Sequence, residues 1–305
     1  MMLGAAMIFD LGYGEYPAPV HPVVWIGRLV DALAARGPEQ GNARQFLFGL
    51  GLTLALVALF ALPAWLALEY VRNEGGSFAY ILVGALALKP TFSLRLLLQS
   101  VAAVRSRLVE GDLKGARLQV GQIVSRDTAA LSPALVAAAA IESAAENFSD
   151  SLVAPLFYFA LGGPAAALGY RVINTIDAMI GYRGRYEYLG KAPARLDDVL
   201  NFVPARLAGV LIALSAGVGG GSAAGAFRTM GRDHAATASP NAGWPMSAMA
   251  GALERRLEKP DHHVLGGAMP FPEPRDIGRA LLVLGGAAVL AVLLVVVSLG
   301  LRYAR

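Results

Sequence analysis

The sequence predicts an all-α, polytopic integral membrane protein with roughly four to five membrane-embedded helices and polar cytoplasmic loops. Of its 305 residues, 56% are hydrophobic and only 16% are charged, against roughly 25% charged in average soluble domains. The mean hydropathy is +0.53. Several apolar runs reach the roughly 20 residues that a helix needs to cross a bilayer, and no strand-like alternation stands out.

The composition also excludes some chemistry. The chain has no cysteine, which rules out disulfides, thiolate metal ligands and a cysteine nucleophile. The net charge of +4 fits basic loops that face anionic lipid or anionic ligands. We expect no nucleic-acid partner, because aromatic and basic residues do not interleave as they do in single-strand binders.

The apolar runs predict the membrane helices. We expect spans at 46–68, 78–104 and 277–301, with a break in the second at Lys89 and Pro90, which are costly in lipid. The small residues of 208–227 suit close helix packing or a re-entrant segment. The chain is predicted to be a single domain whose parts are 1–44 (amino-terminal), 45–104 (two spans), 105–206 (polar motifs), 207–227 (membrane-embedded or re-entrant), 228–276 (motif loop) and 277–301 (last span).

The long polar loops are rich in arginine and lysine, whereas the short connector at 69–77 is poor in charge. The positive-inside rule therefore predicts that the long loops face the cytoplasm and that the connector lies outside. We expect a multi-pass protein of the cell (inner) membrane with its active site on the cytoplasmic side.

Two further helices are indicated by local signals. Ser132-Pro133 is a good helix start, and Pro155 is expected to break that helix near Ala154. A second helix is expected from about Pro245 to 259. The stretch from Arg126 to Pro133 resembles the one from Arg232 to Pro240, with an Arg-Asp pair followed by Ser-Pro in both.

Three carboxylates lie inside the apolar run of the first of these helices. Glu142, Glu146 and Asp150 are four residues apart, so they fall within an arc of about 80° over roughly 12 Å, with Asn147 beside them. No lysine or arginine occurs from 132 to 170, and burying unpaired carboxylates is costly. The pattern favours Mg²⁺ or a cationic substrate over an ordinary solvated face.

Three other polar sets stand out, and two of them have two interpretations each. Arg171, Asn174 and Asp177 form a helical stripe. The stretch containing Arg195, Asp197 and Asp198 fits either a metal-phosphate site or a salt-bridge network. The stretch with Arg232, Asp233, Ser239 and Asn241 fits either an anion-binding turn or a plain loop. We expect the pair His262-His263 to be solvated.

Taken together, the motifs resemble one family. In order along residues 10–265, the chain carries six stretches that are similar to those of the adenosylcobinamide-phosphate synthases, the CobD/CbiB family of cobalamin biosynthesis. They are HPVVWIG, SRDT, ESAAENFSDSLVAPLFY, NTIDAMIGYR, ARLDDVLNFVPARL and RDHAATASPNAGWPMSAMAGAL. The chain departs from the family at Gly14-Glu15-Tyr16-Pro17, where relatives usually have Gly-Asp-Pro.

The resemblance implies a membrane ligase. Such an enzyme would use ATP and Mg²⁺ to join the carboxylate of adenosylcobyric acid to (R)-1-amino-2-propanol or its O-phosphate, giving adenosylcobinamide or its phosphate. The implied partners are this corrinoid substrate, the aminopropanol or aminopropanol phosphate, and the lipid bilayer. A homo-oligomer or a complex with other cobalamin-pathway enzymes stays open.

If the chain is such a ligase, its polar residues can be assigned to metal binding, nucleotide binding and catalysis. Mg²⁺ is assigned to Glu142, Glu146, Asp150, Asp177, Asn147 and Asn174. Nucleotide binding is assigned to Arg126, Asp127, Arg195, Arg232, Asp233, Ser239 and Asn241, because the arginine fork suits phosphate. Asp197 or Asp198 would take the proton from the incoming ammonium, and Glu146 joins them as a catalytic residue.

Two alternative functions are open. Intramembrane carboxylates and a helix broken at Lys89-Pro90 are also typical of transporters. A non-catalytic membrane regulator on the same scaffold is the other alternative, in which degraded acidic motifs would be expected. Here those motifs are intact.

Overall fold

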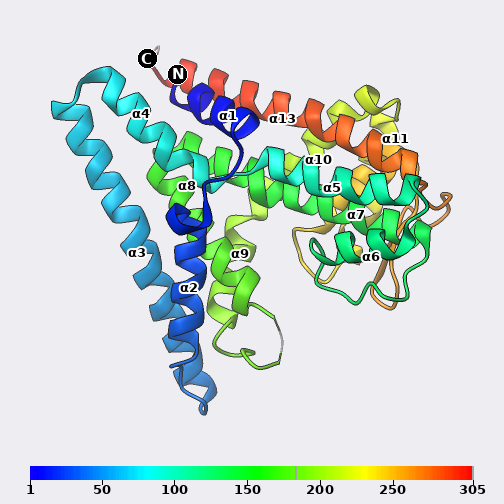
Figure 1. The fold of residues 1–305 in the computed structure, drawn as a ribbon, viewed down its shortest axis with the longest axis horizontal. Helices are drawn as coiled ribbons and strands as arrows, with labels where there is room; N and C mark the ends of the chain where they lie inside the picture. Colours follow the sequence, from blue (N-terminus) through cyan, green and yellow to red (C-terminus); the bar gives the residue numbers. More distant parts are fainter. Residues whose placement is uncertain (183, 304–305) are drawn as a thin grey trace. The chain divides into compact units, whose positions relative to one another are not determined.

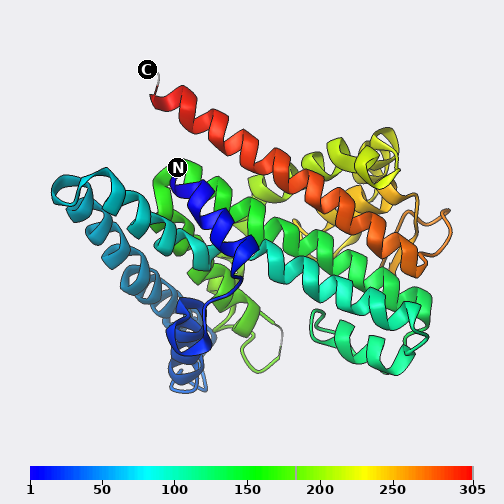
Figure 2. The same cartoon turned by 45° about the horizontal axis from the view of Figure 1, so that its top comes forward.

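The computed structural model describes residues 1–182 and 184–303, and the regular secondary structure of this part of the chain is helical apart from one short two-stranded hairpin. The all-α fold class is thus confirmed. The chain divides into two compact units, one of residues 1–93 and 154–200 and the other of residues 94–153 and 201–305 (Figures 1 and 2). The domain organisation expected from the sequence stays a prediction.

The first unit is built from helices near the amino terminus and from the middle of the chain. They are α1 (Met2–Gly12), α2 (Pro22–Ala34), α3 (Asn42–Glu74), α4 (Gly76–Leu88), α8 (Ala154–Ile180) and α9 (Lys191–Leu200), with 3₁₀ turns at Ala18–Val20 and Lys89–Thr91.

Helix α3 contains the first predicted span, and α4 carries the first part of the second, 78–104, whose last part lies on α5 (Leu94–Val109) (Figure 1). A tight turn joins α3 and α4 at Gly75-Gly76, where Gly76 has a φ of +71°, a conformation that glycine adopts without steric cost. The predicted break is confirmed, because α4 ends at Leu88 and a 3₁₀ turn follows at Lys89–Thr91. Pro90 lacks the N–H that would continue the helix.

The core of this unit lies where α2, α3 and α8 meet. Ile26 and Val30 of α2 pack with Leu56 of α3 and Ile176 of α8, all at most 2% exposed. On α3, Gly49 allows the chain before α9 to approach closely, since a Cβ there would lie 2.9 Å from the carbonyl carbon of Leu189. These contacts fix α8 and α9, the helices that carry the polar residues of this unit.

The second unit holds the remaining elements. They are α5 (Leu94–Val109), α6 (Leu113–Gly121), α7 (Pro133–Phe148), a π-helical turn (Ser149–Val153), α10 (Phe202–Ser215), 3₁₀ turns (Ala216–Gly219 and His234–Ala236), α11 (Ala223–Asp233), α12 (Gly243–Leu253), β1 (Leu257–Lys259), β2 (His263–Leu265) and α13 (Pro274–Tyr303). Helices α5, α7 and α13 lie side by side, and α7 also packs on α12 and β1.

The expectation that Pro155 breaks the helix is wrong. Helix α7 ends at Phe148, a π-helical turn follows, and α8 starts at Ala154 and continues through the proline. Pro155 cannot donate to the carbonyl four residues before it, and a widened π turn accommodates such a residue without ending the helix. The departure from helical geometry comes later, at Gly162-Gly163.

The run 208–227 is not one continuous helix. Helix α10 ends at Ser215, and α11 starts at Ala223, where the Ser222 side chain accepts the N–H of Gly225. The prediction of close packing by small residues is confirmed for Gly225, because a Cβ there would lie 2.7 Å from the Gly251 carbonyl oxygen on α12. Small residues of this kind let helix backbones approach.

The helix expected to run from Pro245 to 259 is also shorter than expected. Helix α12 ends at Leu253, and Glu254 adopts a left-handed conformation with a φ of 57°. The chain then forms β1, which pairs antiparallel with β2 in the register Leu257–Leu265 and Lys259–His263. A short hairpin therefore stands where the sequence indicated only helix and loop.

Within the described residues, five helical stretches are long and apolar enough to cross a membrane, as a multi-pass membrane protein requires. On α3, Leu59, Leu62 and Leu66 are half exposed, which suits a lipid-facing surface. The stretches are Asn42–Glu74, Gly76–Val109, Pro133–Ile180, Phe202–Gly219 and Pro274–Arg302.

Candidate functional site

The Glu142 carboxylate on α7 is the centre of a polar cluster in the second unit. Ser132 caps this helix, and the helix buries Glu142 to 4% exposure. One oxygen, Oε2, accepts a hydrogen bond from Nη2 of Arg126 at 2.7 Å, and the other, Oε1, accepts one from Nε2 of His263 at 2.9 Å. The cation that the sequence led us to expect for Glu142 is thus provided in part by Arg126, which lies outside the stretch 132–170 that contains no lysine or arginine.

The hairpin places its basic residues against α7. His263 is 9% exposed at its side chain, so the expectation that it is solvated is wrong, whereas His262 is exposed as expected. Because a carboxylate only accepts hydrogen bonds, Nε2 of His263 carries the proton. Lys259, the residue paired with His263 in the hairpin, lies within electrostatic range of Glu146.

The other acidic-face residues of α7 and the turn after it are only partly exposed. Glu146 lies within electrostatic range of both Glu142 and Arg126. Asn147 donates to the backbone oxygen of Ser143 at 2.9 Å, which fixes the amide against its own helix. Asp150 lies in the π-helical turn. Glu142 and Glu146 are therefore one turn apart on α7, as the sequence predicts, whereas Asp150 lies beyond the end of that helix and not at the α-helical spacing that the sequence indicated.

Arg232 and Asp233, neighbours in sequence at the end of α11, form an ion pair with each other. Nε of Arg232 and Oδ1 of Asp233 are 2.6 Å apart, and Arg232 is 55% exposed at its side chain. The other carboxylate oxygen accepts the N–H of Gly266 at 2.7 Å. The hydrogen bond from Arg232 lowers the pKa of Asp233 against the effect of burial, and the Gly266 N–H adds to this lowering. Asp233 therefore anchors the end of the hairpin to α11.

The two similar stretches, 126–133 and 232–240, use their serine side chains in a similar way but their charged side chains differently. Each serine accepts backbone N–H groups, whereas the two arginines bind different carboxylates. Ser132 caps α7, and Oγ of Ser239 accepts the N–H groups of Asn241 and Ala242 at 3.2 Å each, just before α12. Arg126, however, binds Glu142 and not its neighbour. Asp127 is exposed and accepts the N–H of Ala129 at 2.9 Å. Both serines thus accept backbone N–H groups, but only Ser132 caps a helix, whereas Ser239 stabilises the turn before α12.

Arg206 contacts both the turn that contains Ser239 and Asn241 and the Trp244 ring at the start of α12. It donates to Oδ1 of Asn241 at 3.4 Å, and its guanidinium lies 4.6 Å from the centre of the Trp244 ring. Trp244 also contacts the ring of His234, with 4.1 Å between the ring centroids. Stacking of this kind holds a guanidinium in one plane, so Asn241 has a defined orientation.

A second polar cluster lies in the first unit, where α8 and α9 pack together. Asn174 accepts from Nη1 of Arg171 and donates to Oδ1 of Asp197, both at 3.2 Å. Asp177 lies one turn further along α8, within electrostatic range of Asp197 and Asp198. The structure therefore brings together two of the polar sets that the sequence shows only as separate motifs.

The edges of this second cluster are also defined. Burial raises the pKa of Asp198, while the opposing charge of Arg195 lowers it. Arg195 itself is exposed. The Tyr158 hydroxyl donates to the carbonyl of Leu200 at 2.8 Å, and its ring stacks on Tyr170. An exposed arginine and a tyrosine thus flank the aspartates.

A third charged group, around Lys89, was missed in the sequence. Lys89 is 1% exposed, and its Nζ lies 3.1 Å from carboxylate oxygens of both Asp10 and Glu15. His21 binds the Glu15 carboxylate at 3.1 Å and also caps α2. Burial would raise the pKa of Glu15, but the hydrogen bond from His21 and the charge of Lys89 outweigh it and lower the pKa. Glu15, which belongs to the Gly-Glu-Tyr-Pro stretch where the chain departs from the family, therefore forms an ion pair with Lys89 at the break after α4.

The clusters differ in how well they fit Mg²⁺, an ion that prefers carboxylate and amide oxygens. Asp177, Asp197, Asp198 and the amide of Asn174 are oxygen-bearing side chains of this kind, although Asn174 and Asp197 each already have an oxygen in a hydrogen bond. Both oxygens of Glu142 accept hydrogen bonds. In the described part of the chain, no three His, Asp or Glu side chains are close enough together to hold a metal ion. The side chains would have to move to coordinate it.

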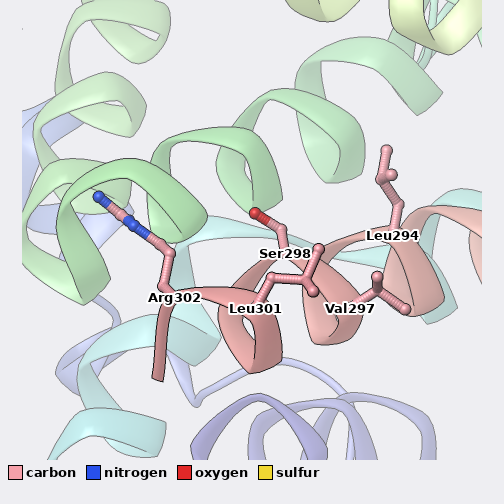
Figure 3. Close-up of a pocket in the computed structure, with 5 residues that line it drawn as sticks. All are labelled: Leu294, Val297, Ser298, Leu301 and Arg302. Carbon is pink, nitrogen blue, oxygen red and sulfur yellow. The ribbon is translucent and has the colours of Figure 1, made fainter. Parts of the chain in front are cut away.

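An open depression lies on the surface of α13. Among the described residues its lining comes from this helix, with Leu294, Val297, Ser298, Leu301 and Arg302 (Figure 3). These residues lie in one of the membrane-length stretches, and mostly apolar side chains on such a helix suit lipid contact.

The fold and the clusters together define a class of protein. It is a helical, multi-pass membrane protein with buried or half-buried acidic, basic and amide side chains on α7, α8, α9 and a hairpin. The family model described as "CobD/Cbib protein" matches residues 3–299. The chain belongs to the CobD/CbiB family.

Curated relatives agree with this membership. The chain is 40% identical over 298 residues to "Cobalamin biosynthesis protein CobD" of Dehalococcoides mccartyi, covering 98% of this chain and 96% of the relative. It is 43% identical over 292 residues to "Probable cobalamin biosynthesis protein CobD" of Pyrococcus abyssi, covering 92% and 90%. No solved structure matches the chain.

Proposed function

We propose that this protein acts in cobalamin biosynthesis as an ATP-dependent ligase. It joins the carboxylate of adenosylcobyric acid to (R)-1-amino-2-propanol or its O-phosphate and gives adenosylcobinamide or its phosphate. The observation that carries the proposal is the family match over residues 3–299, with relatives named for cobalamin biosynthesis. The buried polar clusters support chemistry on a charged substrate.

Amide formation from a carboxylate needs activation, because a carboxylate has no good leaving group. The substrate carboxylate attacks a phosphorus of ATP and displaces ADP or pyrophosphate, which leaves an acyl phosphate or an acyl adenylate. The amine then attacks the acyl carbon, loses a proton and displaces the phosphate or AMP. Such phosphoryl transfer depends on positioning and on neutralising charge. Arg126, Arg195 and Arg232 would hold phosphate oxygens, with Asp127, Asp233, Ser239 and Asn241 shaping the loops around them.

Proton transfer falls to the aspartates of α9. The incoming amine is an ammonium at neutral pH and must lose a proton before it attacks. Asp197 or Asp198 would accept that proton. The hydrogen bond from Asn174 orients Asp197, and burial raises the pKa of Asp198, which makes it a better base than an exposed carboxylate.

When bound, Mg²⁺ would neutralise the nucleotide charge. We assign to it Glu146, Asp150 and Asp177 with the amides of Asn147 and Asn174. For Glu142 the metal role stays a prediction, against which its two hydrogen bonds count. Placing the site at the cytoplasmic face of the inner membrane is supported by the basic residues of the long loops.

Product analysis tests this proposal. Purified protein is incubated with ATP, Mg²⁺, adenosylcobyric acid and either amine, and the products are identified by mass. We expect the amide with one amine or both, and no amide when ATP is left out. Absence of amide, together with counterflow of a corrinoid in proteoliposomes, would instead favour transport.

A further inference from the structure

The β1–β2 hairpin presents two basic residues on one side. Lys259 and His263 are directly opposite each other in the antiparallel register, and residues opposite each other on an antiparallel pair point to the same face. The strand β1 packs against α7, so this basic face meets the helix that carries the acidic residues.

The spacing of the acidic residues matches that of the basic pair. Glu142 and Glu146 are one turn apart on α7, which separates their Cβ atoms by about 5–6 Å. Paired residues of a hairpin are about 4.5–5.5 Å apart. His263 binds Glu142 at 2.9 Å, and Lys259 lies within electrostatic range of Glu146. The hairpin and the helix are therefore in register.

Arg126 also binds Glu142, and one of its N–H donor groups has no hydrogen-bond acceptor among the described residues. Its Nη2 binds Oε2 of Glu142 at 2.7 Å, which fixes the plane of the guanidinium. Nη1 is buried and has no hydrogen-bond partner among the described residues. A buried donor without an acceptor is unfavourable, so an acceptor from a bound molecule would relieve this cost.

We infer that Glu142 and His263 are positioning residues that orient Arg126 to bind a phosphate oxygen of ATP through Nη1. Glu142 does this with both of its oxygens, one on the arginine and one on the histidine. His263 acts through Glu142 and does not touch the nucleotide. This inference rests on the proposed function, because it takes ATP as the ligand.

Adjacent histidines provide a matched test. The variants are His263→Ala, which removes the hydrogen bond, His263→Gln, which keeps an N–H donor, and His262→Ala, which changes the exposed neighbour. ATP binding is measured by titration calorimetry on the purified full chain with Mg²⁺ and no corrinoid. We expect about tenfold weaker binding for His263→Ala, since a hydrogen bond to a charged group contributes about 1.5–3 kcal/mol. His263→Gln and His262→Ala should stay within about threefold of wild type.

Kinetics separate positioning from a general loss of structure. We expect His263→Ala to raise the KM for ATP and to leave the KM for the amine unchanged, whereas a misfolded site would alter both. If His263→Ala does not fold, the comparison of His263→Gln with His263→Asn, whose amide is too short to reach Glu142, carries the test. Equal ATP affinity in that pair would overturn the inference.

The outcomes also distinguish the inference from the proposed function. If wild type binds ATP and forms the amide while His263→Ala and His262→Ala behave alike, the positioning role is refuted and the ligase stands. If wild type binds no ATP, the proposed function fails and the inference fails with it.

Discussion

Glu146 shows what a single carboxylate of the α7 face is expected to do. It is partly exposed, lies beside Glu142, and is within electrostatic range of Lys259 and His263. Glu142 has both oxygens occupied, so Glu146 is the more available oxygen ligand of the pair. The role in binding Mg²⁺ therefore falls more heavily on Glu146.

We expect Glu146→Gln to raise the Mg²⁺ concentration for half-maximal turnover about tenfold or more, the scale seen when groups around a metal are changed. Asp177→Asn should act in the same direction. Turnover is measured as amide formed against Mg²⁺ concentration, with the exposed Glu110→Gln as control. Wild-type turnover of both variants at limiting Mg²⁺ would contradict the assignment.

Glu15 permits a test by pH. Its folded-state pKa is lowered from 4.5, so the unfolded chain binds its proton first as the pH falls. The carboxylate therefore stabilises the fold above pH 4.5, and this contribution is lost as the pH falls through the lower folded pKa.

We expect Glu15→Gln to destabilise the protein at pH 7 by about 1.5–3 kcal/mol, because Lys89 and His21 lose a charged partner. Thermal unfolding in detergent measures the difference from wild type, and that difference should shrink as the pH is lowered. The exposed Glu39→Gln is the control. A difference that stays constant down to acidic pH would exclude this linkage.

At the residue scale, the sequence predicts which acids are unusual but not their partners. The face of Glu142, Glu146 and Asn147 follows from helical periodicity alone. The bond between His263 and Glu142 joins residues 121 positions apart, and no local pattern encodes it. The sequence did contain one usable signal. Glu142 and Glu146 are one helical turn apart, and a hairpin predicted around Lys259 and His263 would have suggested two basic partners for them.

At the scale of elements, long apolar runs were predictable and short features were not. Helix α3 contains the predicted span 46–68, and the break at Lys89 is where Pro90 indicated it. The strands β1 and β2 are three residues each, too short for an alternation to be recognised. The π-helical turn before Pro155 lets the helix continue past the proline, and the hydrophobic periodicity of the sequence does not encode such a turn.

The crossing of α11 and α12 gives a test with a matched pair of glycines. A Cβ on Gly251 would meet the Thr229 side chain at 2.7 Å, whereas nothing lies within 4 Å of a Cβ on Gly231. We expect Gly251→Ala to destabilise the protein by about 1–3 kcal/mol through overpacking. Gly231→Ala should be neutral or stabilising by up to about 1 kcal/mol, because alanine is the better helix former. Equal thermal midpoints for the two variants would show that the helices do not approach closely here.

At the scale of the whole molecule, the topology can be mapped directly, since the chain has no cysteine of its own. We expect Glu74→Cys, at the carboxyl end of α3, to react with a membrane-impermeant maleimide on intact cells. Ala130→Cys, in a loop of the second unit, should react only after the cells are opened. The unmodified chain is the control, and the opposite pattern would reverse the predicted orientation.

The most direct measurement follows the substrate oxygen. Adenosylcobyric acid carrying ¹⁸O in its free carboxylate is converted with ATP, Mg²⁺ and the amine, and the phosphate products are analysed by mass. Because the carboxylate oxygen bonds to phosphorus when it is activated, we expect one ¹⁸O in the phosphate or AMP released for each amide formed. Amide formation without ¹⁸O in any phosphorus-containing product would contradict ATP activation of the carboxylate.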